Sequence, residues 1–164
     1  MRIGIGSDHA GYALKESVKA ILPDLDCEVV DYGTGGTESV DYPDFAFAVA
    51  EAVGGAHCDR GILICKSGIG MSIAANKILG IRAALCLTPE AAALSRAHND
   101  ANILVLGAAW TDADGARDIV SAWVRTPFEG GRHHRRVEKI RTYERETSSG
   151  RGGAAQDRRG EDGS

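Results

Sequence analysis

Short apolar runs alternate with amphipathic stretches along most of the chain of 164 residues. Runs such as ILIC and ILVL are apolar at every position, which is typical of parallel strands covered by helices on both faces. The predicted strands are Arg2–Gly6, Cys27–Asp31, Gly61–Cys65, Arg82–Leu87 and Ile103–Leu106, and the predicted helices lie near Ala10–Leu22, Pro43–Val53, Ile69–Ile78, Pro89–His98 and Asp112–Val124. The alternation predicts a doubly wound α/β fold, in which the ligand site lies at the carboxyl ends of the strands.

The pattern changes after Pro127. A sixth predicted helix, near Arg132–Glu146, is strongly basic, because residues 132–145 carry six Lys and Arg against two Glu. Residues 147–164 contain five glycines and no Val, Ile, Leu, Met or aromatic residue, so they cannot bury enough apolar surface to offset the entropy lost on ordering. We therefore expect one folded domain over residues 1–146 and a disordered tail over 147–164.

Composition argues against several classes of protein. The 19 Lys and Arg are outnumbered by 23 Asp and Glu, a formal net charge of −4, so a generally basic surface for nucleic acid is not expected. No window approaches the roughly 18 to 20 consecutive apolar residues of a membrane span. The N-terminus lacks the pattern of a secretory signal, and the four cysteines lack the spacing of a zinc site. We expect a cytoplasmic protein with free thiols that binds neither nucleic acid nor a membrane.

An acid and an imidazole follow the first predicted strand directly. Asp8 and His9 would lie at the carboxyl end of that strand, where a carboxylate can hold an imidazole in one tautomer and the pair can exchange protons. A structural role is equally consistent with this position, because Asp8 could cap the helix that follows.

The third predicted strand ends in a thiol, Cys65, and a turn punctuated by glycines then opens a helix. Gly68 and Gly70 let backbone N–H groups converge on an anion, either a phosphate or an oxyanion that develops during a reaction. The start of the helix and the neighbouring Lys66 should favour the thiolate form of Cys65. The alternative is a buried structural cysteine beside an ordinary turn. Neither the P-loop pattern nor a complete GxGxxG fingerprint is present, so a dinucleotide cofactor is not expected.

Two further groups of residues gain interest only if the fold brings them to this turn. His98 ends the fourth predicted helix, where a lone histidine is often only a partner of the helix dipole. Arg132 and Arg136 are four residues apart and would share one helix face, where paired guanidinium groups match the oxygens of a phosphate monoester. A charge run is usually a solvated face, and nucleic acid is the alternative ligand, although no aromatic residues interleave with these charges.

Six segments, in this order, resemble the ribose-5-phosphate isomerase B family, which also contains isomerases for galactose 6-phosphate and allose 6-phosphate. The segments are GSDHAG at 6–11, DYP at 41–43, ILIC-x-SGIG-x-SIAANK at 62–77, GIRAA at 80–84, SR-x-HNDAN at 95–102 and EGGRH-x-x-RV at 129–137. The resemblance covers residues 1–146, and it is much less specific for the sugar than for the family.

The resemblance implies a Rossmann-like, doubly wound sheet of five parallel strands, with helices on both faces and a C-terminal helix. It also implies a homodimer or a dimer of dimers, whose active sites draw residues from both chains. The implied reaction interconverts ribose 5-phosphate and ribulose 5-phosphate through a cis-enediolate and needs no metal ion or cofactor. The alternatives are a hexose 6-phosphate isomerase, for allose or galactose 6-phosphate, and a non-catalytic sugar-phosphate binding domain.

The resemblance further implies a role for each candidate residue. Cys65 is the base that moves a proton between C2 and C1, since Met71 stands where another branch of the family carries a glutamate. Ser67 assists this step, and His98 opens the sugar ring with Asp8 as its proton partner. The remaining implied contacts are the backbone of Gly68, Ile69, Gly70 and Met71 around the enediolate, His9, Arg132 and Arg136 on the phosphate, and Tyr42 and Asn99 on the sugar.

Two positions depart from the pattern of the family. Many relatives have a G-x-R sequence after the last strand, where the arginine helps to hold phosphate, whereas this chain has Ala109 in its place. Many relatives also have glycine after the cysteine, where this chain has Lys66. We hypothesise that Lys66 either supplies the cationic character that Ala109 removes or tunes Cys65.

Overall fold

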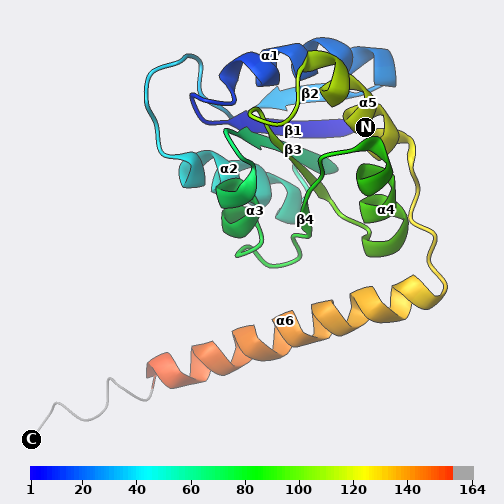
Figure 1. Ribbon diagram of the computed structural model, residues 1–164. Coiled ribbons are helices and arrows are strands. Elements are labelled where there is room, and N and C mark those ends of the chain that lie inside the picture. Colours follow the sequence, from blue (N-terminus) through cyan, green and yellow to red (C-terminus); the bar gives the residue numbers. More distant parts are fainter. Residues whose placement is uncertain (157–164) are drawn as a thin grey trace, which may run out of the picture. The chain divides into compact units, whose positions relative to one another are not determined.

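Five parallel strands form one sheet in the order β2-β1-β3-β5-β4 (Figure 1). The computed structural model describes residues 1–156, which divide into a unit over Met1–Glu129 and a second unit that begins at Gly130. The elements of the first unit are β1 (Arg2–Ser7), α1 (Tyr12–Ile21), the short 3-10 helix η1 (Pro23–Leu25), β2 (Glu28–Asp31), α2 (Tyr42–Gly54), β3 (Arg60–Cys65), α3 (Ile69–Ala75), β4 (Ala83–Leu85), α4 (Pro89–Asn99), β5 (Ile103–Gly107) and α5 (Ala113–Arg125). The described part of the second unit contains one helix, α6 (Arg132–Gln156). The predicted doubly wound parallel sheet is confirmed.

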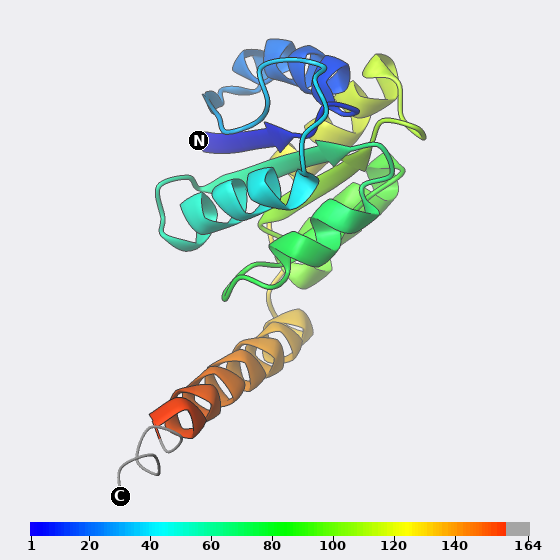
Figure 2. The same ribbon diagram turned by 90° about the vertical axis from the view of Figure 1, so that its left-hand side faces the viewer.

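The two faces of the sheet follow from the alternation of side chains along each strand. In β3, Ile62 and Ile64 pack into the core beneath α1, α4 and α5, whereas Leu63 and Cys65 pack against α2 and α3. In Figure 2, α2 and α3 lie in front of the strands. Because β3 and β5 are covered on both faces, their sequences are apolar at nearly every position. Cys65 therefore belongs to the face that α2 and α3 cover.

Strands β1 and β3 flank the point at which the chain changes direction across the sheet. From β1 the chain moves outward to β2, and it then crosses to β3 on the other side of β1. The register pairs Ser7 with Ile64 at the carboxyl ends of the two strands. Asp8, which follows β1, and Cys65, which ends β3, therefore lie side by side at the same edge of the sheet. In open α/β sheets the ligand crevice lies at such a switch point.

The second unit begins at Gly130, just before α6. The division into a folded domain over residues 1–146 and a tail stays a prediction. Gly130 and Gly131 have φ values of 67° and 52°, in the region that glycine adopts most readily, and this backbone interrupts the chain before α6.

Helix α6 ends later than predicted, at Gln156 and not at Glu146. The hydroxyl groups of Thr147, Ser148 and Ser149 donate to the carbonyl groups four residues earlier, at 2.8–2.9 Å. These side chains bond to the helix's own carbonyl groups, as Ser and Thr commonly do inside helices. Of the predicted tail, residues 157–164 lie outside the described residues. Among the residues that the structure describes, no helix is both long and apolar enough to cross a membrane.

Candidate active site

The turn between β3 and α3 has a shape that requires glycine. Gly68 has φ 78°, in the left-handed region. A Cβ atom at this position would lie 2.5 Å from Leu85 Cδ1 and 3.1 Å from the carbonyl oxygen of Leu106. The turn brings the Gly68 N–H back to the end of β3, where it donates to Cys65 Sγ at 3.1 Å. The sulfur is therefore a hydrogen-bond acceptor in this turn.

The first turn of α3 supplies backbone donors next to this sulfur. The Ser72 amide is the first in the helix to bond back to a carbonyl group, that of Gly68, at 3.0 Å. The Gly70 and Met71 amides precede it and, like the first amides of other helices, have no carbonyl partner within the helix. The Met71 side chain is buried in the same core cluster as Cys65, so only its backbone is available to a ligand.

Ser67 lies between the thiol and this helix. Its Oγ accepts the Ile69 N–H at 3.3 Å, which leaves the hydroxyl proton available for donation. The Ile69 side chain is exposed and points away from the core. The turn therefore combines a sulfur, a hydroxyl donor and backbone N–H groups.

Asp8 and His9 leave β1 next to the end of β3. The Asp8 N–H donates to the Ile64 carbonyl at 3.3 Å. One Asp8 carboxylate oxygen accepts the Gly11 N–H at 2.9 Å, so this oxygen has a structural role in the turn before α1. Asp8 is not itself the N-cap of the helix, because that position is occupied by Gly11. His9 Nδ1 accepts the Val40 N–H at 3.2 Å. The neutral His9 ring therefore carries its proton on Nε2 and presents it as a donor.

Tyr42, the first residue of α2, lies against the start of α3. A Cβ atom on Gly70 would lie 2.7 Å from two carbons of the Tyr42 ring and 3.1 Å from its hydroxyl oxygen. Glycine at position 70 thus lets the ring approach the backbone of the turn. The ring is 40% exposed, so it remains accessible at the surface of the site.

A cluster of charged side chains lies at the start of the loop over residues 32–41, which contains Val40, the hydrogen-bond partner of His9. The ammonium groups of the buried Lys15 and of Lys19 lie 2.6 Å and 2.7 Å from the Asp31 carboxylate. The other Asp31 oxygen accepts the Gly33 N–H at 3.0 Å. Burial raises the pKa of Asp31, but the hydrogen bonds from Lys15, Lys19 and the Gly33 amide outweigh it, and the net pKa is lowered. The cluster fixes the start of the loop.

The segment after β5 is attached to the same turn. The Ala108 N–H donates to the Cys65 carbonyl at 2.9 Å, and the Ala109 N–H donates to the Lys66 carbonyl at 2.8 Å. Trp110 follows and is 65% exposed. Trp110 was not among the predicted site residues. An aromatic residue in the loop that follows a buried strand was the only feature of the sequence that pointed to it.

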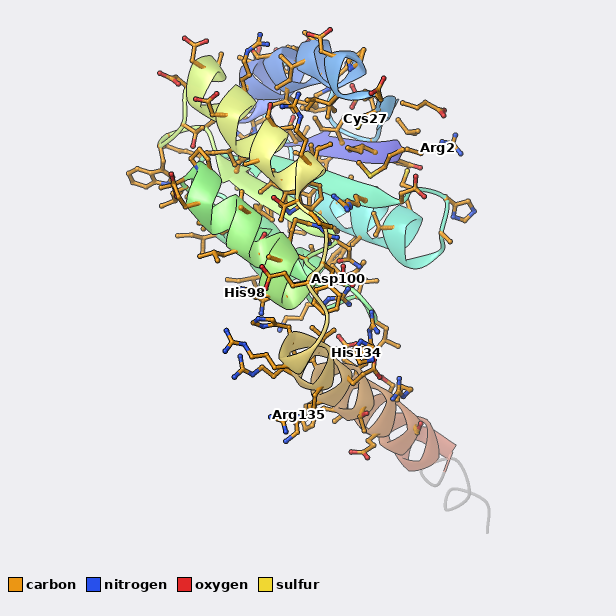
Figure 3. The ribbon with its side chains drawn as sticks, turned by 90° about the vertical axis from the view of Figure 1, so that its right-hand side faces the viewer. Arg2, Cys27, His98, Asp100, His134 and Arg135 are labelled. Atoms are coloured by element: carbon orange, nitrogen blue, oxygen red, sulfur yellow. The ribbon has the colours of Figure 1, made fainter. Side chains whose placement is uncertain are left out.

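His98 and Asn99 lie at the opposite edge of the sheet. They end α4, and the Asn99 carbonyl accepts the side chain of Arg82, just before β4, at 3.0 Å. Figure 3 shows His98 at this end of α4. Strand β3 starts at this edge, and five steps from Arg60 to Cys65, at about 3.3 Å each, span roughly 16 Å. A single chain therefore does not bring His98 or Asn99 to Cys65.

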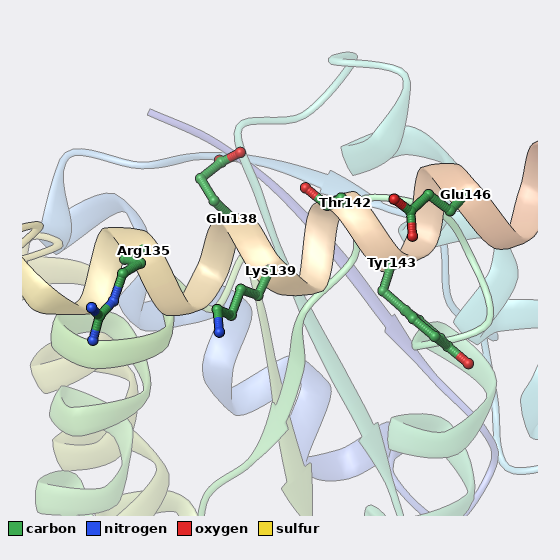
Figure 4. Close-up of a pocket in the computed structure, with 6 residues that line it drawn as sticks. All are labelled: Arg135, Glu138, Lys139, Thr142, Tyr143 and Glu146. Carbon is green, nitrogen blue, oxygen red and sulfur yellow. The ribbon is translucent and has the colours of Figure 1, made fainter.

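Arg132 and Arg136 belong to the second unit. Both are exposed on α6, and their spacing places them on one face, as predicted. Two more basic side chains of the helix, Arg135 and Lys139, lie among acidic and hydroxyl groups (Figure 4). The positive charge of α6 therefore extends beyond the predicted pair. A contact between these arginines and the Cys65 turn remains a prediction.

The remaining cysteines differ from Cys65 in their surroundings. All four cysteines are free and buried. Burial raises the pKa of Cys27 and of Cys86, so both thiols stay protonated near neutral pH. Within residues 1–129, all of which are described, no three His, Cys, Asp or Glu ligand atoms gather closely enough to hold a metal ion.

The sequence also matches a family model. Residues 3–140 match the model described as Ribose/Galactose Isomerase. The chain belongs to this family. The match covers the whole Met1–Glu129 unit apart from two residues and continues into the first part of α6.

This member of the ribose/galactose isomerase family aligns with its relatives over almost their full length. Ribose-5-phosphate isomerase B of Escherichia coli K12 is 48% identical over 143 residues, which are 87% of this chain and 96% of the relative. A putative sugar phosphate isomerase of Bacillus subtilis is 48% identical over 145 residues, 88% of this chain and 97% of the relative. The solved ribose-5-phosphate isomerase B of Clostridium thermocellum is 55% identical with a TM-score of 0.87, covering 90% of this chain and 99% of that one. The type B enzyme of Trypanosoma cruzi is 46% identical with a TM-score of 0.86, covering 89% and 99%.

Proposed function

We propose that this chain interconverts ribose 5-phosphate and ribulose 5-phosphate, with Cys65 as the base. Membership of the Ribose/Galactose Isomerase family and the identity to ribose-5-phosphate isomerase B of E. coli support an aldose–ketose isomerase. The choice of base rests on the position of Cys65 at the switch point of the sheet, with its sulfur held by the Gly68 amide at 3.1 Å. Sugar-phosphate binding alone would not require a thiol there.

The reaction moves a proton between neighbouring carbons. The Cys65 thiolate takes the proton from C2 of the open-chain aldose, the electron pair of that C–H bond forms the C1–C2 double bond, and the aldehyde oxygen becomes the enediolate oxygen. The proton of the C2 hydroxyl then moves to the oxygen on C1, a transfer for which the Ser67 hydroxyl is suitably placed. The Cys65 thiol finally returns its proton to C1, which yields the ketose and restores the thiolate.

The negative charge that develops on the enediolate needs donors that are already in place. Among the backbone groups of Gly68, Ile69, Gly70 and Met71, the Gly70 and Met71 amides supply them, because they have no carbonyl partner within α3. The Gly68 and Ile69 amides hold Cys65 and Ser67 in place beside them. Loss of one such donor typically costs about 3–4 kcal/mol of transition-state stabilisation. In this proposal Tyr42, which lies against Gly70, contacts the sugar.

Opening of the sugar ring calls for residues from a second copy of the chain. His9 presents an Nε2–H donor at the Cys65 edge, but His98 and Asn99 lie at the opposite edge. Ring opening and enolisation act on adjacent atoms of the substrate, so His98, with Asp8 as its proton partner, can serve only if it comes from another subunit. We therefore infer a homodimer, or a dimer of dimers, with shared sites. Exposed apolar side chains available to such an interface are Ile69, Ile73, Leu79, Leu87 and Leu94.

The phosphate ligands in this proposal are His9, Arg132 and Arg136. Paired guanidinium groups on one helix face suit a phosphate monoester. Because the proposed sites are shared, these arginines can act on the site of the same chain or of its partner.

Subunit mixing tests the shared site. Cys65→Ala and His98→Ala should each be inactive alone, whereas a mixed dimer of the two restores one complete site and leaves the other doubly impaired. With random assortment, half of the dimers are mixed and each carries one of two sites, so activity should recover to about a quarter of the wild-type value. Mixing Cys65→Ala with Cys65→Ser is the matched control and should recover nothing. No recovery in the first mixture contradicts a shared site.

A substrate panel tests the reaction itself. Purified protein should isomerise ribose 5-phosphate faster than allose 6-phosphate or galactose 6-phosphate, and Cys65→Ala should abolish turnover. A preference for a hexose phosphate would overturn the choice of substrate. Binding of all three sugars without turnover would indicate a non-catalytic binding domain.

The cellular setting proposed for this reaction is the cytoplasm. Four free cysteines suit a reducing compartment, where disulfides are rare. We propose no nucleic-acid or membrane partner, because the basic residues of α6 are assigned to the sugar phosphate.

A further inference from the structure

The carboxyl edge of the sheet carries more negative than positive charge, although the proposed substrate is an anion. The five loops that leave this edge span residues 8–11, 32–41, 66–68, 86–88 and 108–112. Their charged side chains are four carboxylates and one ammonium, namely Asp8, Glu38, Asp41, Asp112 and Lys66. The first turns of α2, α4 and α5 add further carboxylates, Asp44, Glu90 and Asp114. A phosphate monoester with nearly two negative charges is repelled by most of this edge.

The other lysine at this edge is already paired. Lys15, in the first part of α1, is 1% exposed, and its ammonium lies 2.6 Å from Asp31 and 2.9 Å from Glu16. It cannot turn toward a ligand without leaving Asp31 uncompensated. Lys66 is therefore the one permanently charged cation that the five loops of the Met1–Glu129 unit offer to a ligand.

The backbone of Lys66 is fixed, while its side chain is accessible. Its carbonyl accepts the Ala109 N–H at 2.8 Å, and its neighbours in sequence are Cys65, whose sulfur is held by Gly68, and Ser67. The Lys66 side chain is exposed and forms no hydrogen bond or ion pair with another described residue. Ala109, attached beside it, is small and exposed. A long flexible stem thus carries a mobile charge from a fixed point next to the thiol.

We propose that the Lys66 ammonium binds the phosphate group of the substrate. This inference rests on the proposed function, because that function brings a phosphate monoester to this edge. Lys66 would offset the surrounding carboxylates and add charge-assisted hydrogen bonds at the end of the sugar remote from Cys65. A role through Cys65, by contrast, would change the chemical step and leave phosphate affinity unaffected.

The test compares Lys66→Gln and Lys66→Arg with Lys77→Gln. Lys77 is an exposed lysine just after α3, at the opposite edge of the sheet, and serves as the matched control. Each protein is measured for KM and kcat with ribose 5-phosphate, for Ki of inorganic phosphate, and for Kd of inorganic phosphate by calorimetry. Calorimetry does not depend on turnover, so it tests Lys66 even if wild-type protein leaves ribose 5-phosphate unchanged, the result that would refute the proposed function instead.

Lys66→Gln should raise KM and the Ki and Kd of phosphate by at least about 10-fold, in keeping with one lost hydrogen bond to a charged group, and should change kcat little. Lys66→Arg should keep phosphate affinity within about threefold, because it retains the charge. Lys77→Gln should match the wild type. Phosphate constants of Lys66→Gln within twofold of the wild type overturn the proposal, as does a fall in kcat with phosphate affinity unchanged.

Discussion

Replacement of Gly68 by alanine tests whether the Cys65 turn depends on space as well as on backbone conformation. Gly80 provides a matched control, because the two glycines have φ values of 78° and 76°. A Cβ atom at Gly68 would lie 2.5 Å from Leu85 Cδ1, whereas one at Gly80 would have no neighbour within 4 Å. Alanine in the left-handed region costs about 1–2 kcal/mol, and the less flexible unfolded chain returns about 0.4–1 kcal/mol. Gly80→Ala should therefore lower the free energy of unfolding by about 1 kcal/mol.

At Gly68 the same strain is joined by overpacking, which typically adds about 1–3 kcal/mol. Gly68→Ala should thus lower the free energy of unfolding by about 2–4 kcal/mol. Displacement of the turn also moves the amide that holds Cys65, and misplacement by about 1 Å can reduce turnover roughly 100-fold. Urea unfolding at one fixed protein concentration, followed by tryptophan fluorescence, measures the first effect, and kcat with ribose 5-phosphate measures the second. Equal stability of the two variants, or full kcat in Gly68→Ala, would refute this account of the turn.

Two further predictions concern charge. Asp31 has a lowered pKa in the folded chain, so its stabilising effect is present above the unfolded pKa of about 4 and disappears as the pH falls through the folded pKa. Asp31→Asn should therefore lower the melting temperature at pH 7, with the gap to the wild type closing in strong acid, and a gap that does not depend on pH would contradict the assignment. Iodoacetamide should label Cys65 before Cys27 and Cys86, whose pKa values are raised by burial. Peptide mass spectrometry reads the order, and labelling of Cys27 or Cys86 first would count against Cys65 as the thiolate.

The central strands were the most predictable part of the fold. In Ile62–Cys65 every residue is apolar because both faces of β3 are covered, and the pattern alone distinguishes such a strand from its amphipathic neighbours. Strand β4 was predicted over Arg82–Leu87 but extends only over Ala83–Leu85. It lies at the edge of the sheet and pairs with β5 alone, over three residues. The apolar run is longer than this paired segment, so the hydrophobic pattern predicted too long a strand.

The parts of the site that depend on one chain could also be predicted. Asp8 and Cys65 follow strands that meet at the switch point, and a parallel sheet brings their carboxyl ends together. The separation of His98 from Cys65 follows from the same alternation, because α4 leads the chain back to the start of β5 and therefore ends at the other edge of the sheet. The position of Tyr42 against Gly70 depends on the packing of α2 against α3, which is a tertiary effect.

The end of α6 shows the limit of arguments from composition. A segment without large apolar residues was predicted to be disordered from residue 147 onward. In the structure, residues 147–149 remain helical, with hydroxyl groups bonded to the carbonyl groups four residues earlier. Local hydrogen bonding of this kind leaves no signature in average hydrophobicity.

The most direct test of the account is isomerisation of ribose 5-phosphate by Cys65→Ser, measured beside Cys58→Ser. Both cysteines are buried, but only Cys65 lies at the carboxyl edge of the sheet and accepts the Gly68 N–H. The account predicts that Cys65→Ser keeps its fold and its affinity for ribose 5-phosphate while kcat falls by at least about 100-fold, since a general base contributes about 10²–10⁴ in rate. It predicts nearly full kcat for Cys58→Ser. Undiminished kcat in Cys65→Ser would contradict the central claim that the Cys65 thiolate is the base.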